Sequence, residues 1–421
     1  MPVREPERAP IGPSHGRGPT VNILVLNPAP TVLGYTLFRP PLRVPVARGA
    51  VRGDPGEAAL LAVRTAVSAE TAGAGPDLIG CRVVQGGDLF RNAVCVRPGT
   101  MRAIEGLVSS APLHLPPLLA LLRARAAVFA GVPMVLVFET SFFADLPFRE
   151  NACALNAACT EGLAARRRGF HGILHEAACA HAAARRRARG LQSACRSLSV
   201  CLEPTPEVAA AVGCRPVMTS GGSSPLEGIP GDTTCGEIDP RIVIELARAN
   251  GWGHEKINQV LSRESGLLGL TGEPVTIAGI FDPATRNGAR ARRVLAYRLL
   301  LACGAGAAAM GGVDAIVFSG RYASSMRFLG PWLRGRLVRA MPRAGEEAVA
   351  IECMRDTVEA LVAAQAVAAL PAREAAFQSR LTAARVRTKS PISTSRSRAI
   401  TPHFARRRKN VFPPPSSLSD S

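Results

Sequence analysis

Short, mostly apolar runs, separated by stretches with helical periodicity, constrain the fold of this chain more than any other feature. Such runs occur at Val21–Leu26, Leu78–Val84, Pro133–Phe138 and Val313–Phe318, and each has the length and composition of a buried strand. Helical patterns lie between them, as at Glu57–Thr71, where apolar residues gather on one face. This alternation predicts an α/β fold.

The same patterns divide the 421 residues into parts. Residues 1–20 are rich in Pro, Gly and Arg and are expected to be a disordered extension. Residues 21–149 are expected to form a first α/β domain, and residues 150–355 a second. A last helix at about 356–370 either closes the second domain or returns to the first. Residues 371–421 are rich in Ser, Arg and Pro, which predicts a disordered tail.

Weaker patterns complete the secondary-structure prediction. Residues 21–38 read as a strand, a tight loop and a second strand, and residues 41–46 as a third strand. Further helices and strands are expected at 101–109, 115–127, 174–189, 198–202, 241–249, 254–261, 266–272, 285–310 and 347–351.

The chain is strongly basic, with a formal net charge of +19. Such a charge suits a polyanionic partner. However, residues 380–409 alone hold ten basic residues and no acidic one, so part of the excess belongs to the tail. Because no RNA- or DNA-binding motif accompanies it, a solvated tail is favoured and a nucleic-acid partner is not expected.

Cysteine usage and hydropathy indicate a cytoplasmic protein. The eleven cysteines include no C-x-x-C pair, and an odd number argues against a complete set of disulfides. The first 20 residues lack the apolar core of a secretory signal. The most apolar stretch, Leu115–Phe138, is interrupted by Arg123 and Arg125, so no membrane span is predicted.

A long irregular segment at Thr219–Pro240 stands out at mid-chain. It is rich in Gly, Pro, Ser and Thr, which predicts an ordered loop, and long ordered loops in compact domains are usually functional. It ends at Asp239 and Pro240, which are typical of a helix start. A loop that leads into a capped helix can present N–H groups to an anion, although a plain connecting loop explains it as well.

A set of motifs occurs along the chain in the order ILVLN, IGCRVVQGG, APLHLP, VFETSFF, GFHGILH, PLEG followed by GEIDP, SRESGLLGLTG and VDAIVFSG. Their order and spacing resemble the acetate kinase family, which also includes propionate and butyrate kinases. The resemblance covers about residues 21–370. It implies a duplicated actin-like ATPase (ribonuclease-H-like) fold, with two domains around a central cleft, and a homodimer. It also implies phosphoryl transfer between ATP and a short carboxylate such as acetate or propionate, or from an acyl phosphate to ADP, with Mg²⁺.

The resemblance assigns roles to residues of the carboxylate half. Arg82 matches the arginine that binds the substrate carboxylate, a task that suits a planar guanidinium. His171 matches the transition-state histidine, and His175 a second histidine of that motif. Glu139 lies where the family has an essential aspartate. The small apolar pocket for the acyl chain corresponds to Val84, Leu113, Phe170 and Pro225.

The nucleotide half departs from the family pattern. Asn27 is kept, but prolines and a valine follow where the first phosphate loop has small residues and serines. The second loop has become Cys201–Glu207, which contains two acids and two prolines, and like charge disfavours a polyphosphate. In the third loop Gly320 is kept, and Arg321 remains a candidate phosphate ligand. Thr234 replaces the transition-state arginine.

Two residues correspond to metal-binding positions. Asn27 lies in the first phosphate loop, and Asp356 lies near the late glutamate of the family, so both are candidate Mg²⁺ ligands.

Two functions follow from this comparison. One is an acetate-kinase-like phosphotransferase of low activity, since three altered loops and a lost arginine weaken stabilisation of the transition state. The other is a catalytically inactive family member that acts as a dimeric binding or interaction protein.

Overall fold

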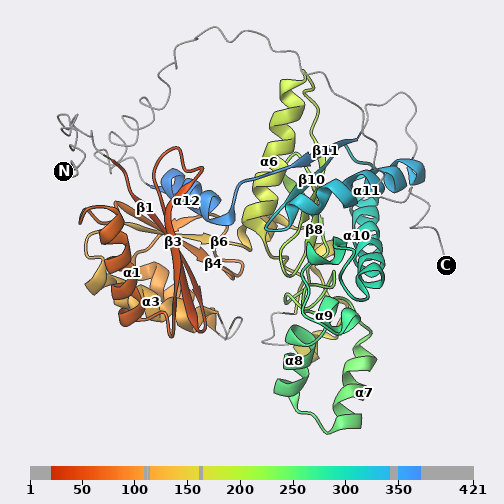
Figure 1. Cartoon of the computed structure of the whole chain (residues 1–421), viewed down its shortest axis with the longest axis horizontal. Coiled ribbons are helices and arrows are strands. Elements are labelled where there is room, and N and C mark those ends of the chain that lie inside the picture. Colours follow the sequence, from red (N-terminus) through yellow and green to blue (C-terminus); the bar gives the residue numbers. More distant parts are fainter. Residues whose placement is uncertain (1–19, 109–110, 112–113, 161–164, 342–348, 371–421) are drawn as a thin grey trace, which may run out of the picture.

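Two β-sheets organise the computed structural model, which describes residues 20–108, 111, 114–160, 165–341 and 349–370 (Figure 1). Within these residues the first sheet has the strand order β3-β2-β1-β4-β6-β5, and the second the order β11-β10-β7-β8-β9. The strands of the first sheet are β1 (Ile23–Ala29), β2 (Val32–Phe38), β3 (Pro45–Arg52), β4 (Leu78–Val83), β5 (Val94–Cys95) and β6 (Met134–Phe138). Those of the second are β7 (Arg196–Cys201), β8 (Glu207–Val212), β9 (Arg215–Thr219), β10 (Ala315–Ser319) and β11 (Ala350–Cys353).

The two sheets repeat one topology. In the first, β1, β2 and β3 form an antiparallel meander, and β4 and then β6 add to β1 in parallel. In the second, β7, β8 and β9 form the meander, and β10 and then β11 add in parallel. This repetition confirms the duplicated actin-like ATPase fold.

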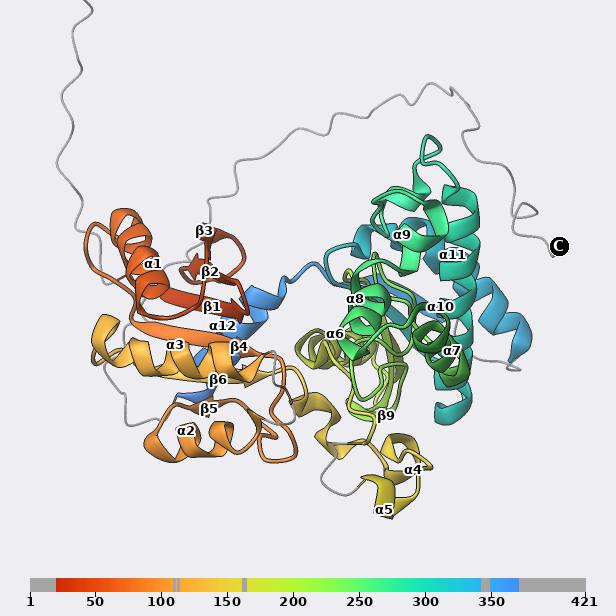
Figure 2. The same cartoon turned by 90° about the horizontal axis from the view of Figure 1, so that it is seen from below.

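Alternation along β1 explains why helices cover both faces of the first sheet. Leu24 and Leu26 point into a core shared with α1 (Glu57–Glu70) and α3 (Leu115–Val128), whereas Ile23 and Val25 point to the opposite face. That opposite face is covered by α12 (Val358–Ala369), the last described helix (Figure 2). A Cβ at Gly80 of β4 would lie 3.1 Å from Val362 Cγ1, so this glycine allows α12 to approach closely.

The second sheet lies between α6 (Gly172–Ala188) and α10 (Gly288–Met310) (Figure 1). Leu198 and Val200 of β7 pack into the core on the α10 side. On the other face, Ser199 meets the buried His175 of α6, with 2.8 Å between Oγ and Nδ1. Helix α12 contacts α6 as well as the first sheet, so it links the two lobes.

The loop predicted at Thr219–Pro240 is irregular from residue 220 to residue 239 and leads into a capped helix, as expected. The Asp239 side chain accepts a hydrogen bond of 2.8 Å from the Arg241 N–H at the start of α7. Helices α7 and α8 project away from the second sheet (Figure 1). The remaining described helices are α2 (Pro98–Glu105), η2 (Ser141–Asp145), α4 (Phe148–Asn151), α5 (Ala157–Thr160), α7 (Pro240–Asn250), α8 (His254–Arg263), α9 (Gly266–Thr271), η3 (Gly279–Phe281), η4 (Ala323–Ser325) and α11 (Met326–Ala340).

Most predicted helices and strands are confirmed, with small shifts at their ends, but one predicted strand is misplaced and two features were missed. The third strand lies at Pro45–Arg52 rather than at 41–46, and neither the β8–β9 hairpin nor α11 was predicted. Strand β8 has the sequence EVAAAV, whose alanines favour a helix. Its burial between α10 and a cluster that includes Phe142 and Phe143 overrides that preference.

Helix α10 is long and apolar enough to cross a membrane by length and composition alone. One face of it, including Leu295, Leu299 and Cys303, is instead buried in the core of the second lobe. This is the pattern of a core helix, and a single such helix is weak support for a membrane span.

Candidate functional site

Arg82 and Glu139 meet where two parallel strands end. In β4 and β6, Arg82 is in register with Val137, so Glu139, which directly follows β6, lies beside the end of β4. The Arg82 Nε donates a hydrogen bond to Glu139 Oε1. The Glu139 side chain is only 2% exposed, whereas that of Arg82 is 21% exposed. The predicted carboxylate-binding arginine and the predicted catalytic carboxylate are therefore brought into contact.

Helix α6 begins against Glu139. The Gly172 N–H donates to the Glu139 backbone oxygen at 3.0 Å, and the Ile173 N–H donates to Glu139 Oε2 at 3.2 Å. A carboxylate at the first turn of a helix is stabilised by the free N–H groups and the helix dipole. Both carboxylate oxygens are therefore engaged, which fixes the orientation of Glu139 toward Arg82.

His171 occupies the N-cap position of α6, with left-handed backbone angles (φ 55°). Its Nε2 lies 3.0 Å from the Thr205 backbone oxygen, and because a carbonyl only accepts, Nε2 is the donor. The other ring nitrogen, Nδ1, is buried and has no hydrogen-bond partner among the described residues. Arg82 and Glu139 are in contact, and His171 directly precedes the Gly172 whose N–H binds Glu139, so we group the three residues under the name acceptor cluster.

The charge balance around Arg82 includes a residue that the sequence did not single out. Burial lowers the pKa of Arg82, but the Glu139 carboxylate, with smaller contributions from Glu203 and Glu359, outweighs burial, so this pKa is raised. Glu359 lies in the first turn of α12. Because α12 is remote from Arg82 in sequence, no local motif predicts the contribution of Glu359.

The four predicted acyl-pocket residues have different environments. Val84 directly follows β4 and Phe170 directly precedes His171, and both are half-buried. Pro225 is exposed on the loop after β9. Leu113 lies outside the described residues.

Glu207 corrects one sequence-based expectation, namely that both acids of the second loop face a polyphosphate. It lies in β8, is buried, and accepts from the Phe170 N–H at 3.1 and 2.9 Å. It also accepts from Thr219 Oγ1 at 2.6 Å and lies 3.7 Å from His175 Nε2. Glu207 therefore anchors the backbone before His171 to the second sheet, and buried donors compensate its charge.

At the position of the predicted first phosphate loop, β1 and β2 form a tight hairpin. Asn27 pairs with Gly34, and only Pro30 and Thr31 connect the strands. Asp356 is exposed, just before the helix-capping Thr357. Among the described residues, no group of three or more His, Cys, Asp and Glu side chains could hold a metal ion.

The third loop is engaged by the chain itself. Gly320 has a left-handed φ of 86°, and the Arg321 N–H that follows donates to Glu203 Oε1 at 2.7 Å. Nearby, the Tyr322 hydroxyl donates to Asp232 Oδ2 at 2.9 Å. Burial and this hydrogen bond raise the pKa of Tyr322 to about 12. The backbone and side chains of the third loop are therefore already engaged by Glu203 and Asp232.

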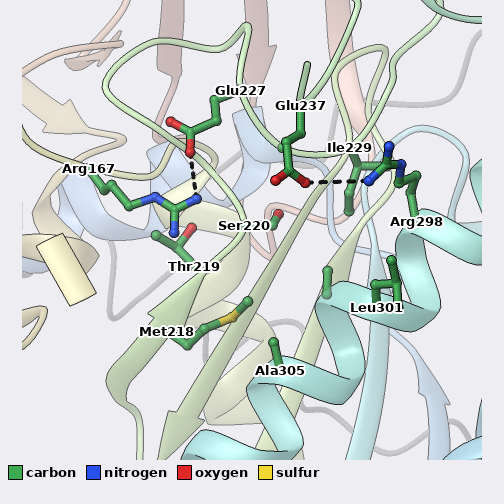
Figure 3. Close-up of a pocket in the computed structure, with 12 residues that line it drawn as sticks. Arg167, Met218, Thr219, Ser220, Glu227, Ile229, Glu237, Arg298, Leu301 and Ala305 are labelled. Carbon is green, nitrogen blue, oxygen red and sulfur yellow. Dashed lines mark hydrogen bonds and ion pairs between the residues drawn. The ribbon is translucent and has the colours of Figure 1, made fainter. Parts of the chain in front are cut away.

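A separate pocket of about 220 Å³ lies between β9, the loop after it and α10 (Figure 3). Arg167 pairs with Glu227 at 2.7 Å on one side, and Arg298 pairs with Glu237 at 3.5 Å on the other. Met218 and other apolar residues line the space between the two pairs. Each arginine of this pocket is therefore matched by an acid.

Comparisons with known proteins agree with this geometry. The sequence pattern of the Acetokinase family matches residues 58–326. The acetate kinase of Coprothermobacter proteolyticus is 37% identical over 245 residues, which cover 57% of this chain and 61% of that protein. That of Dictyoglomus thermophilum is 33% identical over 282 residues, or 66% of this chain and 67% of that protein. The chain therefore matches about three fifths of the length of the first of these relatives.

Solved structures show the same fold. The acetate kinase of Porphyromonas gingivalis superposes with a TM-score of 0.74 and 24% identity, covering 83% of this chain and all of that one. A propionate kinase from Francisella tularensis gives a TM-score of 0.70 at 21% identity, covering 82% of this chain and 98% of that one.

The repeated sheets define a duplicated actin-like ATPase fold, with an arginine–carboxylate pair where the lobes meet. The sequence match extends over more than half of the chain. The chain belongs to the acetokinase family.

Proposed function

We propose that this protein is a phosphotransferase of the acetate kinase type, which transfers a phosphoryl group to or from a short-chain carboxylate such as acetate or propionate, and that its turnover is low. The acceptor cluster carries the proposal. The Arg82 Nε is committed to Glu139, while its terminal nitrogens have no hydrogen-bond partner among the described residues. They remain available for a bidentate interaction with a substrate carboxylate.

The roles in this proposal follow from the contacts. Arg82 binds and orients the carboxylate, and Glu139 holds Arg82 and is the candidate catalytic carboxylate. His171, whose Nδ1 has no hydrogen-bond partner among the described residues, is the candidate to stabilise charge on the transferred phosphoryl group. The acyl chain would lie among Val84, Leu113, Phe170 and Pro225.

The proposed phosphate donor rests on family membership rather than on contacts in the structure. Membership of the family implies ATP or ADP with Mg²⁺, which would neutralise charge on the transferred group. Asn27, Gly320 and Arg321 are the candidate nucleotide residues, and Asn27 and Asp356 the candidate metal ligands. Because Glu203 engages the third loop, we expect weak nucleotide binding and hence slow transfer.

The same contact supports an alternative function. If nucleotide binding is lost altogether, the chain is an inactive family member that retains the acceptor cluster and acts as a dimeric binding or interaction protein.

The test is to measure acyl phosphate formation with acetate, propionate and butyrate in the presence of MgATP. We expect turnover at least tenfold below an ordinary enzyme rate of about 10 per second. Turnover at that ordinary rate would contradict the low activity. Carboxylate binding without any acyl phosphate favours the inactive alternative, and the absence of both rejects the acceptor cluster as a carboxylate site.

We also propose that the chain forms a homodimer in the cytoplasm, with domains at residues 21–149 and 150–355 and with α12 assigned to the first. One face of α10 supports a dimer, because Tyr297, Leu301 and Ala305 follow one another at helical spacing and are exposed. The free cysteines among the described residues are consistent with a reducing compartment.

Introducing a charge on this face tests the dimer. We expect Leu301→Asp to shift the protein from dimer to monomer, because a buried unpaired carboxylate is costly at an interface. Val44→Asp, at an exposed residue of the first lobe, is the matched control and leaves the mass unchanged. Light scattering coupled to size-exclusion chromatography measures both. A wild-type monomer at tens of micromolar, or no effect of Leu301→Asp, argues against this interface.

A further inference from the structure

We propose that the Glu203 carboxylate is an internal anion that takes the place of a phosphoryl group on the backbone of the third phosphate loop, and thereby determines which phosphate donors the site admits. The inference rests on the proposed function, because it takes the third loop to be the donor site. It concerns one acid at the end of β7, where the family motif has a glycine.

The contacts of Glu203 are those of a bound anion. Its Oε1 accepts from the Arg321 N–H at 2.7 Å, and its Oε2 lies 3.6 Å from the Arg321 Nε. The same side chain therefore engages both a backbone donor and a guanidinium. These are the two kinds of group that proteins use to hold phosphate oxygens.

The backbone around Arg321 is built closely onto the segment that carries Glu203. Gly320 has a positive φ of 86°, and a Cβ at this position would lie 2.8 Å from the Leu202 backbone oxygen. The Tyr322 N–H donates to that same oxygen at 2.9 Å. Of the backbone donors after Gly320, the Arg321 N–H is the one that faces an anion, and here the carboxylate of the chain itself accepts from it.

The position of Glu203 also relates the donor side to the acceptor cluster. Its charge contributes to the raised pKa of Arg82, so the carboxylate lies within electrostatic reach of the guanidinium proposed to hold the substrate. The Glu203 side chain is only 16% exposed, so water screens its charge poorly. A polyphosphate that approached the third loop would have to displace this carboxylate or lie against it.

The second acid of the loop supports this assignment by contrast. Glu207 points into the core, where the Phe170 N–H and Thr219 Oγ1 compensate it. Of the two acids, Glu203 is therefore the one expected to repel a polyphosphate. Removal of the Glu203 charge should open the site to anions, whereas removal of the Glu207 charge should not.

The experiment compares Glu203→Gln and Glu203→Ala with the wild type by calorimetric titration at constant ionic strength. Two probes are used, MgATP and magnesium tripolyphosphate. We expect both variants to bind at least one probe roughly 10- to 100-fold more tightly than the wild type, the range that like-charge contacts produce. Tightening for both probes identifies the phosphate chain as the ligand, and tightening for MgATP alone identifies the nucleotide.

Two further variants make the result specific. Glu245→Gln removes a surface acid of α7 that pairs with Arg241, and its affinities should stay within twofold of the wild type. Arg321→Ala removes the guanidinium but keeps the Glu203 charge, so it should not tighten binding. If Arg321→Ala tightens binding as much as Glu203→Gln, then loosening of the loop, rather than loss of an anion, explains the effect and the proposal is wrong.

Unchanged affinity in a folded Glu203→Gln protein, checked by circular dichroism, would also overturn the proposal. Acyl phosphate formation is measured on the same samples. Tightened binding without any acyl phosphate rejects the proposed function but leaves the role of Glu203 intact, so the two failures are distinguishable.

Discussion

Replacing Arg82 with alanine should lower the free energy of unfolding by roughly 3–5 kcal/mol and abolish carboxylate binding. The substitution leaves the Glu139 carboxylate buried, with only the Ile173 N–H as a charge-stabilising partner of its side chain among the described residues. Breaking a buried pair by removing one member costs far more than the pair itself contributes, because the remaining charge stays desolvated. Urea denaturation measures the stability, and acetate titration measures the binding.

A surface pair provides the matched control for this substitution. Arg123 pairs with Glu105 at 2.8 Å, but their side chains are 64% and 45% exposed. Arg123→Ala should therefore cost less than about 1 kcal/mol, since water screens such pairs. The double variant Arg82→Ala with Glu139→Gln should recover part of the lost stability, because it removes the buried charge. A cost below about 1 kcal/mol for Arg82→Ala alone would show that Glu139 is not held as described.

Replacing Gly172 with alanine should cost about 3 kcal/mol or more and should reduce activity at the same time. A Cβ at this position would overlap the Glu139 backbone oxygen, and it would also lie 3.1 Å from Phe142 Cβ. No side-chain rotation can relieve an overlap with backbone, so the start of α6 would have to move away from β6. His171 directly precedes this residue and would move with it.

The control for the second prediction is another helical glycine. A Cβ at Gly304 in α10 would meet no atom within 4 Å, so Gly304→Ala should be neutral or stabilise the protein by up to about 1 kcal/mol through helix propensity. Denaturation of both variants under the same conditions gives the comparison. Equal stability of Gly172→Ala and the wild type would mean that α6 is not packed against Glu139.

The parts of the fold that the sequence predicts well are those in which local pattern and burial agree. The strands β1, β4, β6 and β10 are mostly apolar, and α7 has a capping aspartate followed by proline. By contrast, β8 is rich in alanine, and α11 contains Pro331 inside the helix, so local preference argues against the observed structure in both cases. Packing against other elements decides them.

The candidate site divides in the same way. Arg82, Glu139 and His171 lie in motifs, so their identity could be predicted, and the parallel pairing of β4 with β6 explains why two of them meet. The direction of a side chain could not be predicted. Glu203 and Glu207 are four residues apart in one motif, yet the first contacts the third loop and the second lies in the core. Nothing in the sequence distinguishes the two acids, whereas in the structure Glu203 lies in the loop after β7 and Glu207 begins β8.

Helix α12 has a consequence for how the molecule is made. The strands β1, β4 and β6 leave the ribosome early, but the face that carries Ile23 and Val25 packs mainly against α12, with Ile173 of α6 beside it. One apolar face of the amino-terminal sheet therefore stays exposed until nearly all of the carboxy-terminal lobe has been synthesised. Truncation before α12 should therefore destabilise mainly the amino-terminal sheet, although the deletion is at the carboxy terminus. A chaperone would matter most for the nascent amino-terminal half.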